Sequence, residues 1–144
     1  MKKFLAVAAV SLSTMFGAAA NAQVDLSAEL AALNLTCSTD PASCQLATEA
    51  LMQTLRNSGL PASEINAGIG AVVATVVNVA NSLPPAQKQQ LAGAVALASD
   101  PNVGFVGSSP EVLEQIAAAN NITDALETGG DVDSNVISQL GSGN

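Results

Sequence analysis

The sequence lacks histidine and is very poor in aromatic residues. Its 144 residues contain no Trp, no Tyr and three Phe. Without histidine, the ordinary Ser-His-Asp and Cys-His arrangements that activate a nucleophile are excluded. The Trp and Tyr side chains on which sugar-binding platforms and interface hot spots depend are missing as well. We therefore expect a protein that is not an enzyme and that carries no cofactor.

Basic residues are almost as scarce, with four Lys and Arg against twelve Asp and Glu, for a net charge of −8. Lys2 and Lys3 precede every acidic residue, so the chain beyond them has two basic residues, Arg56 and Lys88, and a charge near −10. Nucleic acids and anionic lipid surfaces are bound mainly through Lys and Arg. We expect the protein to bind neither. A Ser-Lys dyad would have to use Lys88, which we expect to be exposed, and a carboxylate pair remains formally available.

The first residues have the pattern of a secretory signal peptide. Two lysines precede a mostly apolar stretch over 4–16, and Ala20-Asn21-Ala22 has the small-x-small form of a cleavage site. The apolar stretch is shorter than the roughly 20 residues of a spanning helix. We therefore predict a bacterial export signal over 1–22, cleavage after Ala22 and no stable membrane span afterwards. The mature protein would be periplasmic or extracellular.

Cys37 and Cys44 are the two cysteines of the chain. A zinc site needs about four ligands, which a chain without histidine cannot easily supply. The redox motif has two residues between its cysteines, whereas six intervene here. Because export leads to an oxidising compartment, we predict a structural disulfide. It would join the incoming segment to a helix with Asp40 as N-cap and Pro41 as first residue.

Apolar residues recur at helical spacing along most of the remaining chain. They predict five helices, over 26–35, 41–57, 61–82, 85–99 and 108–120. Asn120-Asn121 is expected to end the fifth helix, with room for one more turn before Gly129. The short connections favour antiparallel neighbours. We predict an all-α fold, a small up-down bundle of about five helices, with one domain over 23–128 and a flexible acidic, Gly/Ser-rich tail over 129–144.

The third predicted helix has the most continuous apolar face, formed by Ile65, Ile69, Val72, Val76 and Val79. Small residues at four-residue spacing let another helix approach closely, so we expect this helix to be central. The face serves either as core or as an interaction surface. A membrane helix is an alternative, although three asparagines interrupt the segment. A strand is another, because the segment is rich in β-branched residues.

Two further features have a structural and a functional interpretation. Phe105 is the one aromatic residue beyond the leader, and it either closes the end of the core or forms an exposed contact. Asp131, Asp133 and Asn135 have the spacing of the first ligands of a calcium loop. The glycine and the distal glutamate that complete such a loop are absent, so we predict no metal site.

These observations favour an exported, non-catalytic helical protein that acts as a structural or protein-interaction module, through an unknown partner or through self-association. The alternative is a carrier that holds a small apolar ligand between its helices. A membrane-active peptide is disfavoured by the negative charge.

Overall fold

The computed structural model describes residues 26–141, so the expected signal peptide and its cleavage site lie outside the described residues. Within this range the chain forms six α-helices, one 3-10 helix and no strand. The elements are α2 (Ser27–Thr39), α3 (Pro41–Arg56), α4 (Ala62–Ala80), α5 (Pro85–Ala96), η1 (Leu97–Ser99), α6 (Pro110–Glu127) and α7 (Ser134–Gly141).

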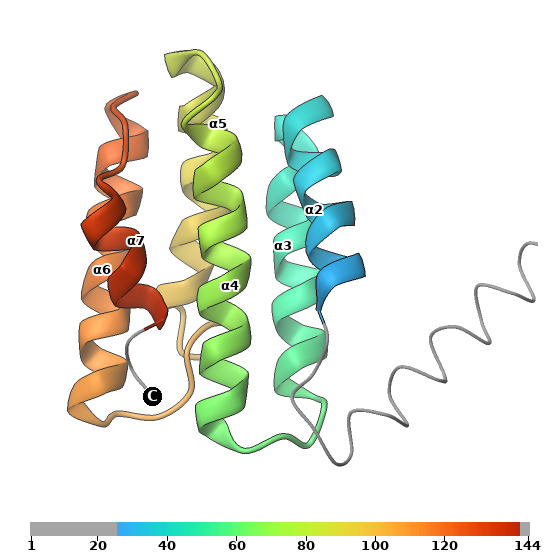
Figure 1. Ribbon diagram of the computed structural model, residues 1–144, viewed down its shortest axis with the longest axis vertical. Coiled ribbons are helices and arrows are strands. Elements are labelled where there is room, and N and C mark those ends of the chain that lie inside the picture. The colour runs from blue at the N-terminus through green and yellow to red at the C-terminus, as the bar shows by residue number, and fades with distance from the viewer. Residues whose placement is uncertain (1–25, 142–144) are drawn as a thin grey trace, which may run out of the picture.

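The helices form two layers and alternate in direction along the chain (Figure 1). Helices α2, α4 and α7 form the layer nearer the viewer, and α3, α5 and α6 lie behind them. The prediction of an all-α up-down bundle is therefore confirmed, with six helices in place of about five. Proline opens α3, α5 and α6, where its fixed φ suits the first helical position and its missing N–H costs no hydrogen bond.

Helix α4 is the centre of the bundle and packs against each of the other α-helices. Ile69, Val72 and Val76 are fully buried. Its glycines allow close approach, since a Cβ on Gly70 would lie 2.6 Å from the main-chain oxygen of Leu140. The expectation of a central helix is confirmed, and the strand alternative is wrong for this segment. Packing against the five other α-helices outweighs the β-preference of its valines.

The expected break at Asn120-Asn121 is wrong, because α6 continues through both residues to Glu127. Both asparagines are exposed. Their side-chain amides point to the surface and do not replace the hydrogen bonds of the helix backbone. Asn120 accepts a hydrogen bond from the Ser99 hydroxyl at 2.7 Å. Burial of Ala118, Ala119 and Ile122 on the opposite side holds the helix together across them.

The C-terminal region also differs from the prediction of a flexible tail over 129–144. Residues 134–141 form α7, which packs against α4 and α6. Leu140 and Val132 are buried, and the Gln115 amide donates to the main-chain oxygen of Leu140 at 2.7 Å. The segment has an apolar face, formed by Val136, Ile137 and Leu140 at helical spacing. The prediction missed this face because the rest of the segment is polar and lies between glycines.

Candidate functional site

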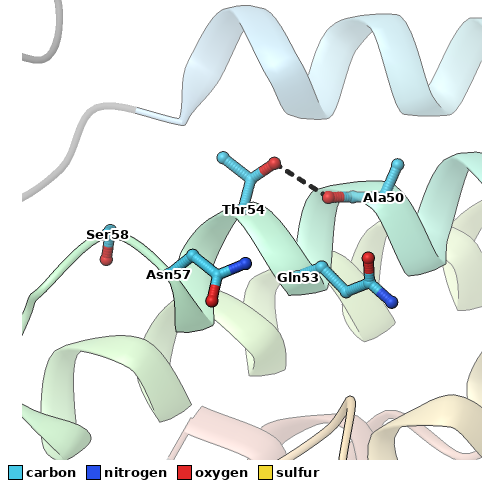
Figure 2. A pocket seen from close by; sticks show the side chains of 5 residues that line it. All are labelled: Ala50, Gln53, Thr54, Asn57 and Ser58. Carbon is cyan, nitrogen blue, oxygen red and sulfur yellow. Dashed lines mark hydrogen bonds between the residues drawn. The ribbon is translucent and has the colours of Figure 1, made fainter.

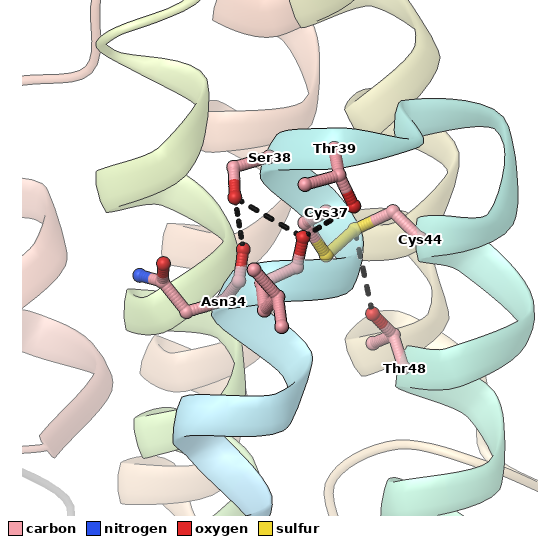
Figure 3. Close-up of a disulfide and its surroundings, with 7 residues drawn as sticks. Asn34, Cys37, Ser38, Thr39, Cys44 and Thr48 are labelled. Atoms are coloured by element: carbon pink, nitrogen blue, oxygen red, sulfur yellow. Dashed lines mark hydrogen bonds between the residues drawn. A yellow bond between two sulfur atoms is a disulfide. The ribbon is translucent and has the colours of Figure 1, made fainter.

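The Cys37–Cys44 disulfide is present and joins α2 to α3 across the single connecting residue Asp40 (Figure 3). The two Cα atoms are 4.5 Å apart, and both cysteines are fully buried. Asp40 does not cap α3 with its side chain; its carboxylate accepts from the Ser43 hydroxyl at 2.6 Å instead. The disulfide prediction is confirmed, and the bridge fixes how the two helices pair.

The face predicted on the third helix is core. Ile65, Ile69, Val72, Val76 and Val79 are at most 6% exposed, so none of them is available to a partner. The same burial accounts for the apolar length of α4, which among the described helices is the one long and apolar enough to span a membrane.

Phe105 also belongs to the core, at 3% exposure. Its N–H donates to the Ala98 oxygen at 3.0 Å, which folds the loop after η1 back over the end of the bundle. Its burial agrees with the interpretation of Phe105 as a plug and not with that of an exposed contact.

The loop over 100–109 is held by side chains from two helices. The Asn66 amide donates to the Val106 oxygen at 2.9 Å and accepts from the Val106 N–H at 2.7 Å. Arg56 donates to the Gly104 oxygen at 2.6 Å. One of the two basic residues beyond the leader is therefore engaged in a structural contact.

The other basic residue, Lys88, is buried at 6% exposure, which corrects the expectation that it is exposed. Its ammonium pairs with Asp131 in the segment between α6 and α7. The Asp133 carboxylate accepts from the Asn135 N–H at 2.8 Å at the start of α7. Two members of the calcium-like pattern thus have structural roles. Within residues 26–141, no three His, Cys, Asp or Glu side chains gather closely enough to hold a metal ion.

Two shallow hollows lie side by side on the surface of α2 and α3. The larger, about 520 Å³, is lined by α3 and the turn after it (Figure 2). The smaller, about 260 Å³, lies between the two helices and is mostly apolar, and both hollows share Ala50 and Thr54. Its lining residues are Glu29, Ala32, Leu33, Ala47, Ala50, Leu51 and Thr54.

Two exposed leucines lie about one helical turn from residues that line these hollows, since Leu35 follows Ala32 by three residues and Leu46 precedes Ala50 by four. Leu35 is 64% exposed and Leu46 is 71% exposed. They stand two residues before Cys37 and two residues after Cys44, so the disulfide places them at the same level of the helix pair. Two residues turn a helix by about 200°, which directs both leucines away from the buried cysteines. We call the surface formed by Glu29, Ala32, Leu35, Leu46 and Ala50 the α2–α3 face.

The α2–α3 face is also almost free of charge. Every exposed residue within α2 and α3 is uncharged, and the charged residues of the two helices, Glu29, Glu49 and Arg56, are only half-exposed. Helix α6, in contrast, exposes four carboxylates. They are Glu111, Glu114, Asp124 and Glu127.

Glu29 is the unusual group of this face. Its Oε2 atom is shielded from solvent and has no hydrogen-bond partner. Shielded carboxylate oxygens normally accept a hydrogen bond, because leaving one unmade costs about 1–3 kcal/mol. Glu29 lines the smaller hollow, but this oxygen does not reach its solvent-exposed surface.

Sequence reasoning did not single out the α2–α3 face, although a signal exists. Leu35 and Leu46 fall off the apolar stripes of their helices, which run through Leu33 and Cys37 in α2 and through Cys44, Thr48 and Met52 in α3. A leucine outside the buried stripe is a candidate surface contact.

Comparisons of the chain with protein families, with curated proteins and with solved structures find no match in any of the three. The fold and the site are therefore argued from this chain alone.

Proposed function

We propose that the protein is an exported, non-catalytic module of the bacterial periplasm or exterior that acts by binding another protein. Export is supported by the leader-like first 22 residues and by the Cys37–Cys44 disulfide, which suits an oxidising compartment. A non-catalytic role is supported by the absence of histidine from the sequence and by the structural engagement of Lys88 and Arg56.

The observation that carries the interaction role is the α2–α3 face. Leu35 and Leu46 leave apolar area in water about one helical turn from an apolar hollow, on a surface with almost no charge. Interfaces are distinguished by depletion of charge at their centre, and adjoining exposed apolar side chains mark contact surfaces. Self-association is the other form of this role.

The alternative of an apolar-ligand carrier gains less support. The two hollows lie on the outer side of α2 and α3, and the larger is lined by Gln53, Thr54, Asn57 and Ser58 besides Ala50. At the centre of the bundle, positions that a ligand could use are filled by close helix contacts, as at Gly70.

The test has two arms. The whole chain is expressed in a bacterium, and the product is located by fractionation and weighed under native conditions. Export predicts a chain that begins at Gln23, is about two mass units lighter than its dithiol form and is found outside the cytoplasm. A full-length chain retained in the cytoplasm would contradict export, and a bound apolar compound would favour the carrier.

The second arm tests binding in the cell. A photoreactive residue replaces one exposed residue at a time, at Leu46, Gln90 and Leu113, on three different helices. Amine-directed reagents are unsuitable because Lys88 is buried. The proposal predicts a discrete crosslinked product from at least one position, and no product from any of them would contradict an interaction role.

A further inference from the structure

We propose that residues 131–141 form a detachable strap, which is docked in the folded protein and opens as a unit while the rest of the bundle stays folded. The strap consists of α7 and the three residues before it, and the ion pair between Lys88 and Asp131 controls its opening. The strap goes beyond the proposed function, because it does not involve the α2–α3 face. It gives the bundle a second conformation that salt favours.

The strap begins where α6 has already completed its own end. The N–H of Gly129 donates to the Leu126 oxygen, and the N–H of Gly130 donates to the Ala125 oxygen, each at 2.9 Å. Gly129 has a φ of 76°, in the left-handed region that glycine adopts freely. Because these bonds close α6 without any group of the strap, the strap can leave without unwinding α6.

The first residues of the strap are attached by two polar contacts. Asp131 pairs with Lys88 on α5, and the N–H of Val132 donates to the Asn81 side chain at 3.1 Å, directly after α4. The side chain of Asp131 is 77% exposed, whereas that of Lys88 is 8% exposed. Because salt screens exposed charges, the ion pair loses strength through its carboxylate as the ionic strength rises. The attachment of the strap is therefore sensitive to salt.

The last turn of the strap is attached by the side chain of Gln115. Its amide donates from α6 to the main-chain oxygen of Leu140, one of the carbonyls at the end of α7 that lack a helical partner. The Oε1 atom of the same side chain is buried without a hydrogen-bond partner. An unpaired buried acceptor destabilises the docked form, and opening of the strap admits water to it.

The packing of the strap is limited as well. Helix α7 has eight residues, of which Leu140 is buried and Val136 and Ile137 are half-buried. Helix α4, in contrast, buries most of its 19 residues. A helix shorter than about 12 residues is not stable in water by itself, so α7 unfolds when it leaves the bundle. The strap therefore opens at a lower free energy than the bundle.

Opening uncovers a surface on α4 and α6. A Cβ on Gly70 would lie 2.6 Å from the Leu140 oxygen, so the strap rests directly on the backbone of α4. The Gln115 amide lies under the same turn of the strap. Both groups become accessible when the strap leaves, and the open form then presents a surface that the docked form covers.

Native-state hydrogen exchange of the whole, disulfide-intact protein in low concentrations of urea tests the proposal. The amides of α7 are expected to be protected but to open with a weaker dependence on urea than those of α4, because opening of the strap exposes less surface than unfolding of the bundle. From about 0.01 M to about 1 M salt, exchange in α7 is expected to become about threefold faster or more. The amides of α4 report unfolding of the whole bundle and serve as the reference.

Two charge variants test control by the ion pair. Asp131→Asn keeps the side-chain shape and is expected to speed exchange in α7 about fivefold at low salt and to remove its dependence on salt. Glu127→Gln removes an exposed carboxylate of α6 outside the ion pair, and it is expected to leave exchange in α7 unchanged.

Two glycine variants test the contact between the strap and α4. Gly70→Ala places a Cβ against the Leu140 oxygen and is expected to speed exchange in α7 about tenfold or more. Helix α4 itself should persist, since Ala favours a helix more than Gly does. Gly93→Ala in α5 brings a Cβ to 2.7 Å from the Oε1 atom of the exposed Gln45, which can move away, so exchange in α7 should not change.

Three results would overturn the inference. An equal dependence on urea in α7 and α4 would mean that α7 unfolds only with the whole bundle. Exchange in α7 without protection would mean that the strap is not docked. Separate opening that neither salt nor Asp131→Asn changes would remove control by the ion pair. Each of these results leaves binding through the α2–α3 face untouched, so the proposed function stands or fails separately.

Discussion

At the residue scale, Asn66 supplies hydrogen-bond partners to the backbone of an irregular loop. Elsewhere in proteins, strand pairing or a helix cap has this role. Its amide bonds both the N–H and the oxygen of Val106, and the side chain is 5% exposed. Buried backbone groups need such partners, and the loop over 100–109 has few repeating bonds of its own. Asn66 thus holds the loop over 100–109, as Lys88 holds the segment between α6 and α7 through Asp131.

Replacing Asn66 by Ala is expected to destabilise the protein by about 1–3 kcal/mol, because it removes both hydrogen-bond partners from the N–H and the oxygen of the half-buried Val106. Urea denaturation measures the loss. The control is Asn78→Ala, an exposed asparagine on the same helix, where a change within about 0.5 kcal/mol is expected. Equal effects of the two substitutions would contradict the role assigned to Asn66.

At the scale of the element, the sequence predicted those helices whose start is marked by proline and whose apolar stripe is long. Helices α3 and α5 begin at the predicted residues, Pro41 and Pro85. Helix α7 was missed because its eight residues are too few for a stable isolated helix and depend on packing against α4 and α6. The continuation of α6 through Asn121 was missed for a similar reason, since buried contacts on its other side outweigh local preference.

The candidate site was predictable only in part. The disulfide followed from the number and spacing of the cysteines. For Ile69 and Phe105, the local sequence left open whether the side chain is buried in the core or exposed as a contact. The structure shows that both are buried. The α2–α3 face and the burial of Lys88 depend on which segments meet in space, and helical periodicity within one segment does not contain that information.

The disulfide is expected to stabilise the α2–α3 pair by about 2.5 kcal/mol, from the closure of an eight-residue loop in the unfolded chain. The variant Cys37→Ala/Cys44→Ala should lose about that much in urea denaturation while it keeps its helices. Ser38→Ala, an exposed position next to the bridge, serves as the control. An unchanged free energy of unfolding would mean that the bridge adds nothing to the paired helices.

Helix α7 makes a second prediction at this scale. Leu140 is 1% exposed, and Leu140→Ala should cost about 2–4 kcal/mol if α7 is docked as described. Ser138→Ala, on the exposed side of the same helix, should cost much less. Amide hydrogen exchange gives an independent measurement, because a docked α7 is protected. Fast exchange over 134–141, together with an unchanged free energy of unfolding in Leu140→Ala, would contradict the docked helix and support the prediction of a flexible tail.

At the scale of the whole molecule, the two kinds of surface lie on different helices. Exposed carboxylates gather on α6, whereas the exposed residues of α2 and α3 are uncharged. Net negative charge makes copies of the molecule repel one another, and that repulsion is weakest at the uncharged surface of α2 and α3. The distribution therefore fits one contact surface on an otherwise repellent molecule.

The bundle also predicts a spectrum. Helices make up 77% of the described residues, and α4 is helical despite its β-branched sequence. The far-UV circular dichroism of the purified protein should therefore show the pair of minima typical of α-helix. A single minimum of the strand type would show that α4 does not keep its helical form in solution.

The scarcity of basic side chains has a consequence for survival outside a cell. Trypsin-like proteases cut after Lys or Arg, and beyond the leader those residues are Arg56 and Lys88. Lys88 is buried within α5 and paired with Asp131, whereas Arg56 is the half-exposed last residue of α3 and is bonded to the Gly104 oxygen. Cleavage after Lys88 should therefore proceed only as fast as the bundle opens, and the bond after Arg56, at the start of an exposed turn, is the one candidate for cleavage in the folded chain among residues 26–141. A protein released among secreted proteases would gain persistence from the same shortage of positive charge that shapes its surface.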